Sequence, residues 1–392
     1  MDIEFFYKIL NVDSTSGKEA ELADILSVEF SGPSRKVELF EVGDGTKNLL
    51  VSWGSPKLIF CTHLDTVPPY LPPHSEPVCH PASTCHSERS EESPTENLVI
   101  RGRGTCDAKG QLFAMWEACK TLETRGCTDF GLLLLAGEET GSFGAKAFDR
   151  LVSENPSVIL NGARDLSVQD VWVIVGEPTD NCMASAAKGT KAFKVTFEGR
   201  AFHSGYLENG ISAVDLFNDF MNALRSIRFP KDEVLGETTF NIGKLFSDNP
   251  QNILSEKLTC RVYFRTTFES DEMVCNVMKN IAGPDAKLRF GRPRVQDGSD
   301  IVAKDVASWQ KAMTVKPFGG DAPTRFDTLP GFETKPVSFG SDAPQLSNFK
   351  HKILCGPGSI LVAHRPEECV TMEDLETAVG NYIKIYNSLV NN

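Results

Sequence analysis

The stretch FGLLLLAGEETGS, residues 130–142, joins a strand to a charged turn. Its first half is a continuous apolar run, which is typical of a strand covered on both faces. Its second half places two adjacent carboxylates, Glu138 and Glu139, directly after that strand. Because like charges at close range destabilise each other, this pair indicates a place where cations neutralise them. An acidic pair alone is more often a solvated turn, so the interpretation depends on the rest of the chain.

The same pattern of apolar strands and helices extends outward from this stretch. The runs KLIFC (57–61) and VWVIVG (171–176) predict further buried strands, and helical periodicity predicts helices over 109–124 and 143–154. This alternation is typical of an α/β fold with helices on both faces of the sheet. We also expect strands at KVELFEV (36–42) and NLLVSW (48–53), and helices at 3–10, from a Ser16–Glu19 capping box to about residue 30, and at 372–390 behind a Thr371–Asp374 cap.

From about residue 188 the strands alternate polar and apolar residues instead. We expect a strand at KAFKVTFEG, a helix over 210–227, strands at ETTFNIGKLF and EKLTCRVYFRTTF, a helix over 271–282 and a short strand at AKLRF. This β-α-β-β-α-β order is the ferredoxin-like motif. The sequence therefore predicts an inserted domain at 185–296 within a larger domain formed by 1–184 and 297–392, the latter with a helix near 300–314.

Residues 70–98 interrupt the larger domain with a segment rich in Pro, Ser, Glu and His. Such a segment cannot bury enough apolar surface to order itself, so we interpret it as an exposed insertion. Its Cys79-His80 and Cys85-His86 pairs leave a small zinc knuckle open as an alternative. No second ligand pair follows them at a zinc-like spacing, which favours the surface insertion.

The composition excludes several classes of protein. The chain has 392 residues, of which 41% are hydrophobic, and a formal net charge of −13. This balance argues against a nucleic-acid-binding protein, which needs a positive face. No apolar run approaches ~18 residues, so no membrane span is expected. Eleven scattered cysteines and no visible secretory signal predict reduced thiols and a cytoplasmic location.

Five groups of potential metal ligands stand out, four of them each at the end of a predicted apolar strand and the fifth far downstream. A lone histidine after a strand is more often structural, and each group alone is weak evidence. In an α/β sheet, however, sites gather at the carboxyl ends of the strands, so these groups could converge. They are His63 with Asp65, Asp107, Glu138 with Glu139, Glu177, and His364 with Glu368.

Charge counting supports a centre with two metal ions. Two Zn²⁺ bring four positive charges, and Asp107, Glu139 and Glu177 bring three negative ones, so one hydroxide would make the site neutral. His63 and His364 add neutral nitrogen ligands. Each metal would receive one histidine, one glutamate and a share of Asp107. Glu138 is then left over as a general base beside the metals.

The motifs THLDTVP (62–68), GRGTCDAKG (102–110), GEETG (137–141), VGEPT (175–179) and AHRPEE (363–368) resemble those of a known family. It is the di-zinc amidohydrolase and exopeptidase family of acetylornithine deacetylase, succinyl-diaminopimelate desuccinylase and glutamate carboxypeptidase. The resemblance covers nearly the whole chain apart from 70–98. It implies a zinc-exopeptidase-like mixed sheet flanked by helices, with the inserted ferredoxin-like domain as a lid that also forms a homodimer.

The resemblance also implies roles for individual residues. His63, Asp107 and Glu177 would hold one Zn²⁺, and Asp107, Glu139 and His364 the other, with Co²⁺ or Mn²⁺ also acceptable. Glu138 would be the base, and Asp65 would orient His63. In the lid, His203 (AFHSG) would reach a neighbouring active site and stabilise the oxyanion. The residues expected to bind the carboxylate of the substrate are Lys188, next to Gly189, Asn252 and Arg265.

The implied reaction is metal-assisted hydrolysis of the amide bond of a small N-acyl amino acid. GSDAP (340–344) and the AHRPEE ending look closest to acetylornithine-deacetylase-like members. That points to N-acetylornithine, or to N-acetyl- or N-succinyl-citrulline, in arginine biosynthesis. The alternatives are a dipeptidase or carboxypeptidase, a succinyl-diaminopimelate desuccinylase and, more distantly, a non-catalytic relative that binds amino acid derivatives.

Four further residues are interpreted as structural or are left open between two roles. We expect Cys61 and Cys106 to be buried packing residues, because no histidine-bearing triad is evident beside them. His351 is expected to be structural or exposed. Asp342 has two possible roles: it supports the metal ligands without binding the metal, or it caps a loop.

Overall fold

A computed structural model of the chain describes residues 1–43, 45–77, 98–161, 167–281, 295–296, 299–300 and 313–390. The chain forms two compact units. Unit 1 comprises Met1–Ser185, Phe326–Lys335 and Ser341–Asn392, and unit 2 comprises Ala186–Arg325 and Pro336–Gly340.

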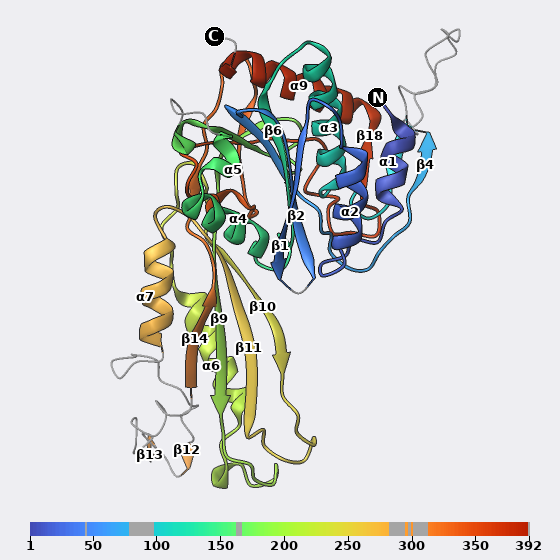
Figure 1. Ribbon diagram of the computed structural model, residues 1–392. Coiled ribbons are helices and arrows are strands. Elements are labelled where there is room, and N and C mark those ends of the chain that lie inside the picture. Colours follow the sequence, from blue (N-terminus) through green and yellow to red (C-terminus); the bar gives the residue numbers. More distant parts are fainter. Residues whose placement is uncertain are drawn as a thin grey trace, which may run out of the picture. The chain divides into compact units, whose positions relative to one another are not determined.

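Unit 1 is built on a mixed six-stranded sheet (Figure 1). In the spatial order given below, the first two pairs of neighbouring strands are antiparallel, and the other three pairs are parallel. Parallel neighbours end at the same edge of the sheet, so the residues that follow β6, β3 and β7 are brought together there. The strands, in spatial order, are β1 (Lys36–Gly43), β2 (Thr46–Gly54), β6 (Asp129–Leu135), β3 (Leu58–His63), β7 (Trp172–Val175) and β17 (His351–Leu354).

Helices cover both faces of this sheet, as the apolar strands predicted. Leu49, Val51 and Trp53 of β2 share one core with α1 (Ile3–Leu10), α2 (Ala20–Glu29), α3 (Lys109–Thr124) and α9 (Met372–Val390). On the other face, Asn48 donates a hydrogen bond to the carbonyl of Gly144 in α4 (Phe143–Glu154), at 2.9 Å. The short α5 (Ser157–Leu160) follows α4.

One predicted helix cap is confirmed and one is wrong. Thr371 accepts a hydrogen bond from the main-chain N–H of Asp374, at 3.0 Å, in front of α9. The Ser16–Glu19 capping box does not form, because α2 begins only at Ala20. The Ser16 hydroxyl instead donates to Oδ2 of Asp65, at 2.7 Å. A partner about fifty residues away outcompetes the local cap.

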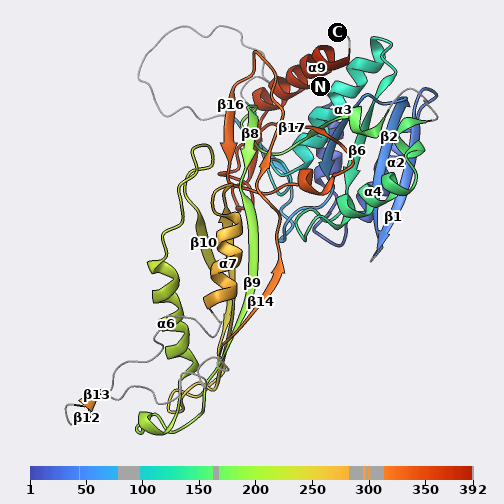
Figure 2. The ribbon, with the colours of Figure 1, turned by 90° about the vertical axis from the view of Figure 1, so that its left-hand side faces the viewer.

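Unit 2 has the ferredoxin-like order (Figure 2). Its four-stranded sheet has the order β10-β11-β9-β14 with antiparallel neighbours, and α6 and α7 share one core with it. The elements are β9 (Gly189–Glu198), α6 (Ala213–Ser226), β10 (Thr239–Phe246), β11 (Lys257–Thr266), α7 (Asp271–Ile281) and β14 (Met313–Gly319).

The end of this unit differs from the predicted boundary at 296. The unit continues to Arg325, because β14 pairs with β9 and so completes the sheet. The strand predicted at AKLRF (286–290) and most of the helix predicted near 300–314 lie outside the described residues. The motif is therefore the expected one, with its last strand further along the chain.

The remaining elements are short. Most of the 70–98 insertion, with both of its Cys-His pairs, lies outside the described residues, while His74 lies in β4. Among the helices that the structure describes, none combines the length and the apolar character needed to cross a membrane. The short strands form three small sheets. One consists of β15 (Thr324–Arg325), β8 (Met183–Ala187) and β16 (Thr334–Val337), and another of β18 (Cys369–Thr371), β5 (Leu98–Arg101) and β4 (His74–Pro77). The third pairs β12 (Val295–Gln296) with β13 (Ser299–Asp300). The 3₁₀ turns are Val168–Asp170, Leu207–Asn209 and Ala343–Gln345.

A charged cluster joins Arg35, the residue before β1, to β2 and α3. The Arg35 guanidinium lies 4.9 Å from the ring centre of Trp116, and its Nε donates to Glu123 Oε1 at 3.0 Å. Trp53 Nε1 donates to the same oxygen at 2.9 Å. The hydrogen bonds from Arg35 lower the pKa of Glu123 to about 2.

This cluster predicts an acid-sensitive contribution to stability. Because the folded-state pKa of Glu123 lies below its ordinary value of 4.5, the contribution is complete above that pH and is lost as the pH falls towards about 2. We expect Glu123→Gln to lower the free energy of unfolding at pH 7 by about 2 kcal/mol, allowing for partial solvent exposure, with a smaller deficit at pH 3.5. Urea unfolding followed by tryptophan fluorescence measures this. The exposed Glu21→Gln is the control, and an equal deficit at both pH values would contradict the prediction.

Candidate metal centre

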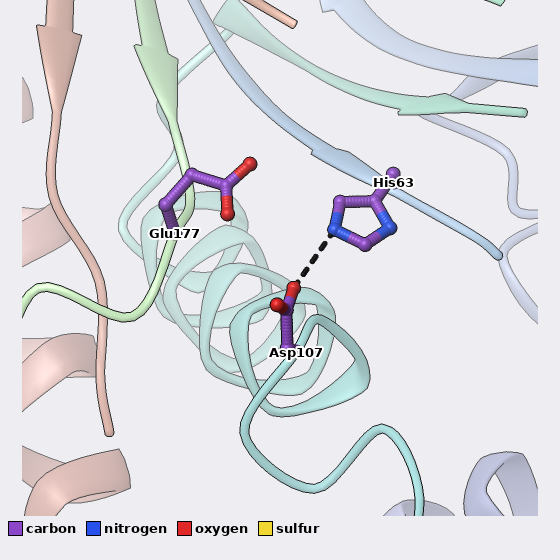
Figure 3. Close-up of side chains that lie close together, drawn as sticks. All are labelled: His63, Asp107 and Glu177. Atoms are coloured by element: carbon purple, nitrogen blue, oxygen red, sulfur yellow. Dashed lines mark hydrogen bonds and ion pairs between the residues drawn. The ribbon is translucent and has the colours of Figure 1, made fainter. Parts of the chain in front are cut away.

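Three predicted ligands meet at the carboxyl edge of the sheet in unit 1 (Figure 3). His63 is the last residue of β3, Glu177 follows β7, and Asp107 lies just before α3. One ligand atom from each lies within 4.8 Å of the other two, and all three residues are buried. His63 Nε2 lies 3.0 Å from Asp107 Oδ1. Neighbouring parallel strands thus bring His63 and Glu177 together, and the turn before α3 adds Asp107.

A second group of ligands shares Asp107. Ligand atoms of Asp107, Glu139 and His364 also lie within 4.8 Å of one another. His364 Nε2 lies 2.7 Å from Glu139 Oε1 and 3.2 Å from Asp107 Oδ2. The two oxygens of Asp107 therefore face different histidines. His364 has a left-handed backbone with φ of 63°, which is unusual for a residue other than glycine and is often found at functional sites.

The electrostatics of the two groups fit divalent cations. Burial, reinforced by the negative charges of Asp107 and Glu138, raises the pKa of Glu177 well above its usual range. Hydrogen bonds with Asp107 and Glu139 raise the pKa of His364 to about 10. Protons thus compensate the crowded carboxylates when no metal is bound, and cations would supply the same positive charge. Imidazole nitrogens and carboxylate oxygens are also the ligands that zinc prefers in this kind of site.

Glu138 lies beside these groups but belongs to neither. It is half-buried, and burial raises its pKa well above the usual range, helped by Asp342 and Glu139. A carboxylate with a raised pKa that is close to potential metal ligands is suited to exchange protons near neutral pH.

Asp65 contacts the site in two ways. Its main-chain carbonyl lies 2.8 Å from His63 Nδ1, whereas its carboxylate oxygen Oδ1 is 3.5 Å from the same nitrogen. The carboxylate accepts hydrogen bonds from the main-chain N–H groups of Glu138, at 3.0 Å, and Glu139, at 3.3 Å. It also accepts the Ser16 hydroxyl bond. This buried carboxylate therefore contacts His63 and also holds the turn that carries Glu138 and Glu139. The sequence did not indicate this second role.

Cys61, Cys106, His351 and Asp342 are all buried or half-buried. Cys61 and Cys106 are buried, and burial raises the pKa of both thiols well above the usual range, as expected of packing residues. His351 is half-buried and stacks on Trp172 at 4.4 Å. Asp342 is buried at the start of the Ala343–Gln345 turn, where its side chain makes no capping hydrogen bond, and burial raises its pKa to about 7.

The predicted substrate-binding residues lie in or at the edge of the sheet of unit 2, at two separate places. Lys188 and Arg265 are half-buried near one end, where Thr190 of β9 pairs with Arg265. Burial and the charge of Arg265 lower the pKa of Lys188. His203 and Asn252 are exposed near the opposite end, where His203 pairs with Ile253. Unit 2 therefore places Lys188 near Arg265 and His203 near Asn252, but these two pairs lie at opposite ends of its sheet.

Comparison with known proteins agrees with this geometry. The model of the peptidase family M20/M25/M40 matches residues 59–388. The chain belongs to this family. It is therefore a metal-dependent hydrolase, and the predicted membership of the amidohydrolase and exopeptidase family is confirmed at this level. A probable carboxypeptidase of Aspergillus niger is 29% identical over 99% of this chain and 89% of its own.

Two solved structures have the same fold. A tripeptidase from Staphylococcus aureus matches with a TM-score of 0.71 and 18% identity, over 100% of this chain and 98% of that chain. A dinuclear metal-binding peptidase of the M20 family from Bacillus subtilis matches with a TM-score of 0.60 and 12% identity, over 99% and 97%. The predicted α/β fold with an inserted ferredoxin-like domain is thus confirmed.

The contacts of Asp65 predict the effect of neutralising it. In Asp65→Asn one carboxylate oxygen becomes an N–H donor, which faces the donors that the oxygen accepted before. We expect a loss of about 10- to 100-fold in metal affinity or in kcat/KM, since the turn with Glu138 and Glu139 loses its anchor. Metal affinity is measured by competition with a chromogenic chelator. Ser16→Ala removes only one of the donors and should cost less; Asp65→Asn with wild-type affinity and turnover would disprove the role.

Proposed function

We propose that this chain hydrolyses the amide bond of a small peptide or N-acyl amino acid at a centre of two divalent cations. One observation carries the proposal. Two groups of ligands share Asp107 through its two oxygens, and a further, half-buried glutamate, Glu138, lies next to them. A shared carboxylate with an adjacent free base is the arrangement that two-metal hydrolysis requires.

In this proposal His63, Asp107 and Glu177 hold one cation, and Asp107, Glu139 and His364 hold the other. Zinc suits the nitrogen and oxygen ligands, and cobalt or manganese would also bind. The Bacillus subtilis relative, named as a dinuclear metal-binding peptidase, supports a pair of ions. When bound, the cations polarise the amide carbonyl and make water a stronger acid.

Glu138 is the proton carrier in this proposal. Its carboxylate accepts a proton from the attacking water and passes it to the nitrogen of the leaving amine. The Asp65 carboxylate accepts a hydrogen bond from the main-chain N–H of Glu138, at 3.0 Å. The turn that presents Glu138 to the substrate is therefore held in place. Asp65 also keeps His63 in place through its carbonyl.

The substrate that we favour is a short peptide with a free C-terminal carboxylate. The Aspergillus niger relative is named as a probable carboxypeptidase, which supports this class. In unit 2, half-buried Lys188 and Arg265 offer two cations within one region, and such a pair suits recognition of a carboxylate. Asn252 and His203 are proposed to act on substrate and oxyanion from a second copy, in a homodimer formed through unit 2.

A second candidate is the deacylation of N-acetylornithine or of N-acetyl- or N-succinyl-citrulline. The run VSFGSDAPQL (337–346) and the AHRPEE ending favour it, because they resemble acetylornithine-deacetylase-like sequences. The relatives named as carboxypeptidases give this narrower class no support. Both candidates use the same metal centre and differ in what unit 2 accepts.

The proposed role of Glu138 predicts that metal binding and turnover separate. Glu138→Gln keeps the size of the side chain but cannot accept the proton, so kcat should fall by about 100-fold or more while two metal ions remain bound. Metal content is measured by elemental analysis after dialysis, and kcat with saturating substrate. Glu139→Gln is the matched contrast, since loss of a ligand should lower the metal content itself. Wild-type turnover by Glu138→Gln would rule out the role.

The substrate class is tested by a panel with the metal-loaded protein. We expect dipeptides with a free C-terminal carboxylate to be hydrolysed, and their C-terminal amides to be poorer by about 30-fold or more in kcat/KM, since a lost charge pair costs about 2 kcal/mol. Chelator-treated protein is the control. Faster hydrolysis of N-acetylornithine, N-acetylcitrulline or N-succinylcitrulline would favour the deacylase instead, and no metal-dependent hydrolysis of any substrate would contradict the proposed function.

A further inference from the structure

The carboxylate of Glu368 is enclosed by main-chain N–H groups of the segment that carries Asp107. Glu368 lies four residues after His364 and is fully buried. Its Oε1 accepts hydrogen bonds from the N–H groups of Gly104, at 2.8 Å, Cys106, at 3.2 Å, and Asp107, at 3.1 Å. Its Oε2 pairs with the guanidinium of Arg103. The last of these main-chain donors belongs to the shared metal ligand itself.

The segment is shaped to receive this carboxylate. Gly102 and Gly104 have φ values of 134° and 86°, in the region that favours glycine. A Cβ on Gly104 would lie 3.0 Å from a methyl carbon of Thr66, which is tighter than ordinary van der Waals contact, so the packing also favours glycine. Main-chain N–H groups that converge in such a loop form a binding place for an anion. Here the anion is a side chain of the same protein.

Further hydrogen bonds from the segment with Asp107 to main-chain carbonyls join the two segments. The N–H of Gly102 donates to the carbonyl of Glu368 at 3.1 Å, and Arg103 Nη1 donates to the carbonyl of Arg365 at 3.4 Å. Arg103 and Glu368 are both almost completely inaccessible to solvent, at 2% and 0% exposure. The segment with His364 and the segment with Asp107 are therefore fixed to each other by their main chains as well as by one buried ion pair.

We propose that Glu368 is a positioning residue that sets the direction of the Asp107 carboxylate, so that each of its oxygens serves one metal ion. This inference rests on the proposed function. Asp107 Oδ1 and Oδ2 lie 3.0 Å from His63 and 3.2 Å from His364, so a small rotation of its main chain would favour one group over the other. Functional side chains tolerate only about 0.5 Å of misplacement, and Glu368 holds the main chain of Asp107 directly.

The chain offers a conservative variant and a matched control. Glu368→Gln keeps the volume, but its amide N–H₂ would face the Arg103 guanidinium, donor against donor, and leave a buried charge unpaired. The double variant Arg103→Met with Glu368→Gln removes that lone charge and serves if the single variant folds poorly. Glu367→Gln is the control, because the Glu367 side chain is 64% exposed and lies 3.6 Å from Arg365 Nε.

The test is titration of the metal-free proteins with Co²⁺, followed by the visible absorption of the bound ion. The wild type and Glu367→Gln should bind two Co²⁺ with the same spectrum. Glu368→Gln, or the double variant, should bind Co²⁺ about tenfold more weakly or worse, with an altered spectrum, at a temperature where circular dichroism shows the protein to be folded. The spectrum reports ligand geometry, which a merely stabilising residue would not change.

The outcomes separate the two proposals. Two Co²⁺ bound by the wild type, with the same affinity and spectrum in the folded variants, would overturn the role of Glu368 and leave the proposed function standing. A lower melting temperature as the only effect would overturn it equally. Absence of Co²⁺ binding by the wild type would overturn the proposed function and this inference together.

Discussion

The arrangement of unit 1 depends on one buried carboxylate that faces two histidines. Asp107 meets His63, from the third strand, and His364, from near the end of the chain, with different oxygens. Such a carboxylate is costly to bury unless positive charge lies on both sides. The parallel strands end at one edge, where Glu139 and Glu177 complete the two groups, so the need for positive charge there increases. The sheet thus brings like charges together, and the positive charge that makes this arrangement tolerable has to come from protons or bound cations.

Local patterns in the sequence predicted much of this and missed what lies behind it. Apolar runs followed by His63, Glu139 and Glu177 have a recognisable pattern, because burial and strand ends leave a local signal. The bonds of Asp65 and Glu368 to distant main-chain N–H groups leave none, since any residue but proline supplies the donor. For the same reason Ser16 was predicted to cap a helix and instead bonds to Asp65. The last strand of unit 2, β14, was missed because Pro317 and Gly319 interrupt its strand pattern.

The chemistry and the choice of substrate depend on different parts of the chain. All five proposed metal ligands and Glu138 belong to unit 1, whereas the basic residues proposed to recognise a carboxylate belong to unit 2. This division explains why the sequence identified a metal-dependent amide hydrolase but not its substrate. Ligand positions are constrained by the metal, while Lys188 and Arg265 need only present positive charge. Both proposed substrate classes, peptides and N-acyl amino acids, are therefore compatible with the same proposed centre.

Two carboxylates that bind no metal in the proposed centre hold the residues that do. Asp65 accepts main-chain N–H groups of the Glu138–Glu139 turn, and Glu368 accepts those around Asp107. Charge-assisted bonds of this kind are about twice as strong as neutral ones, which a neutral amide at either position would not match. Asp65 also adds a negative charge behind the ligands, and this favours bound cations, whereas the charge of Glu368 is balanced by Arg103. We infer that Asp65 supports metal binding through both its charge and the geometry that it fixes, and Glu368 through geometry alone.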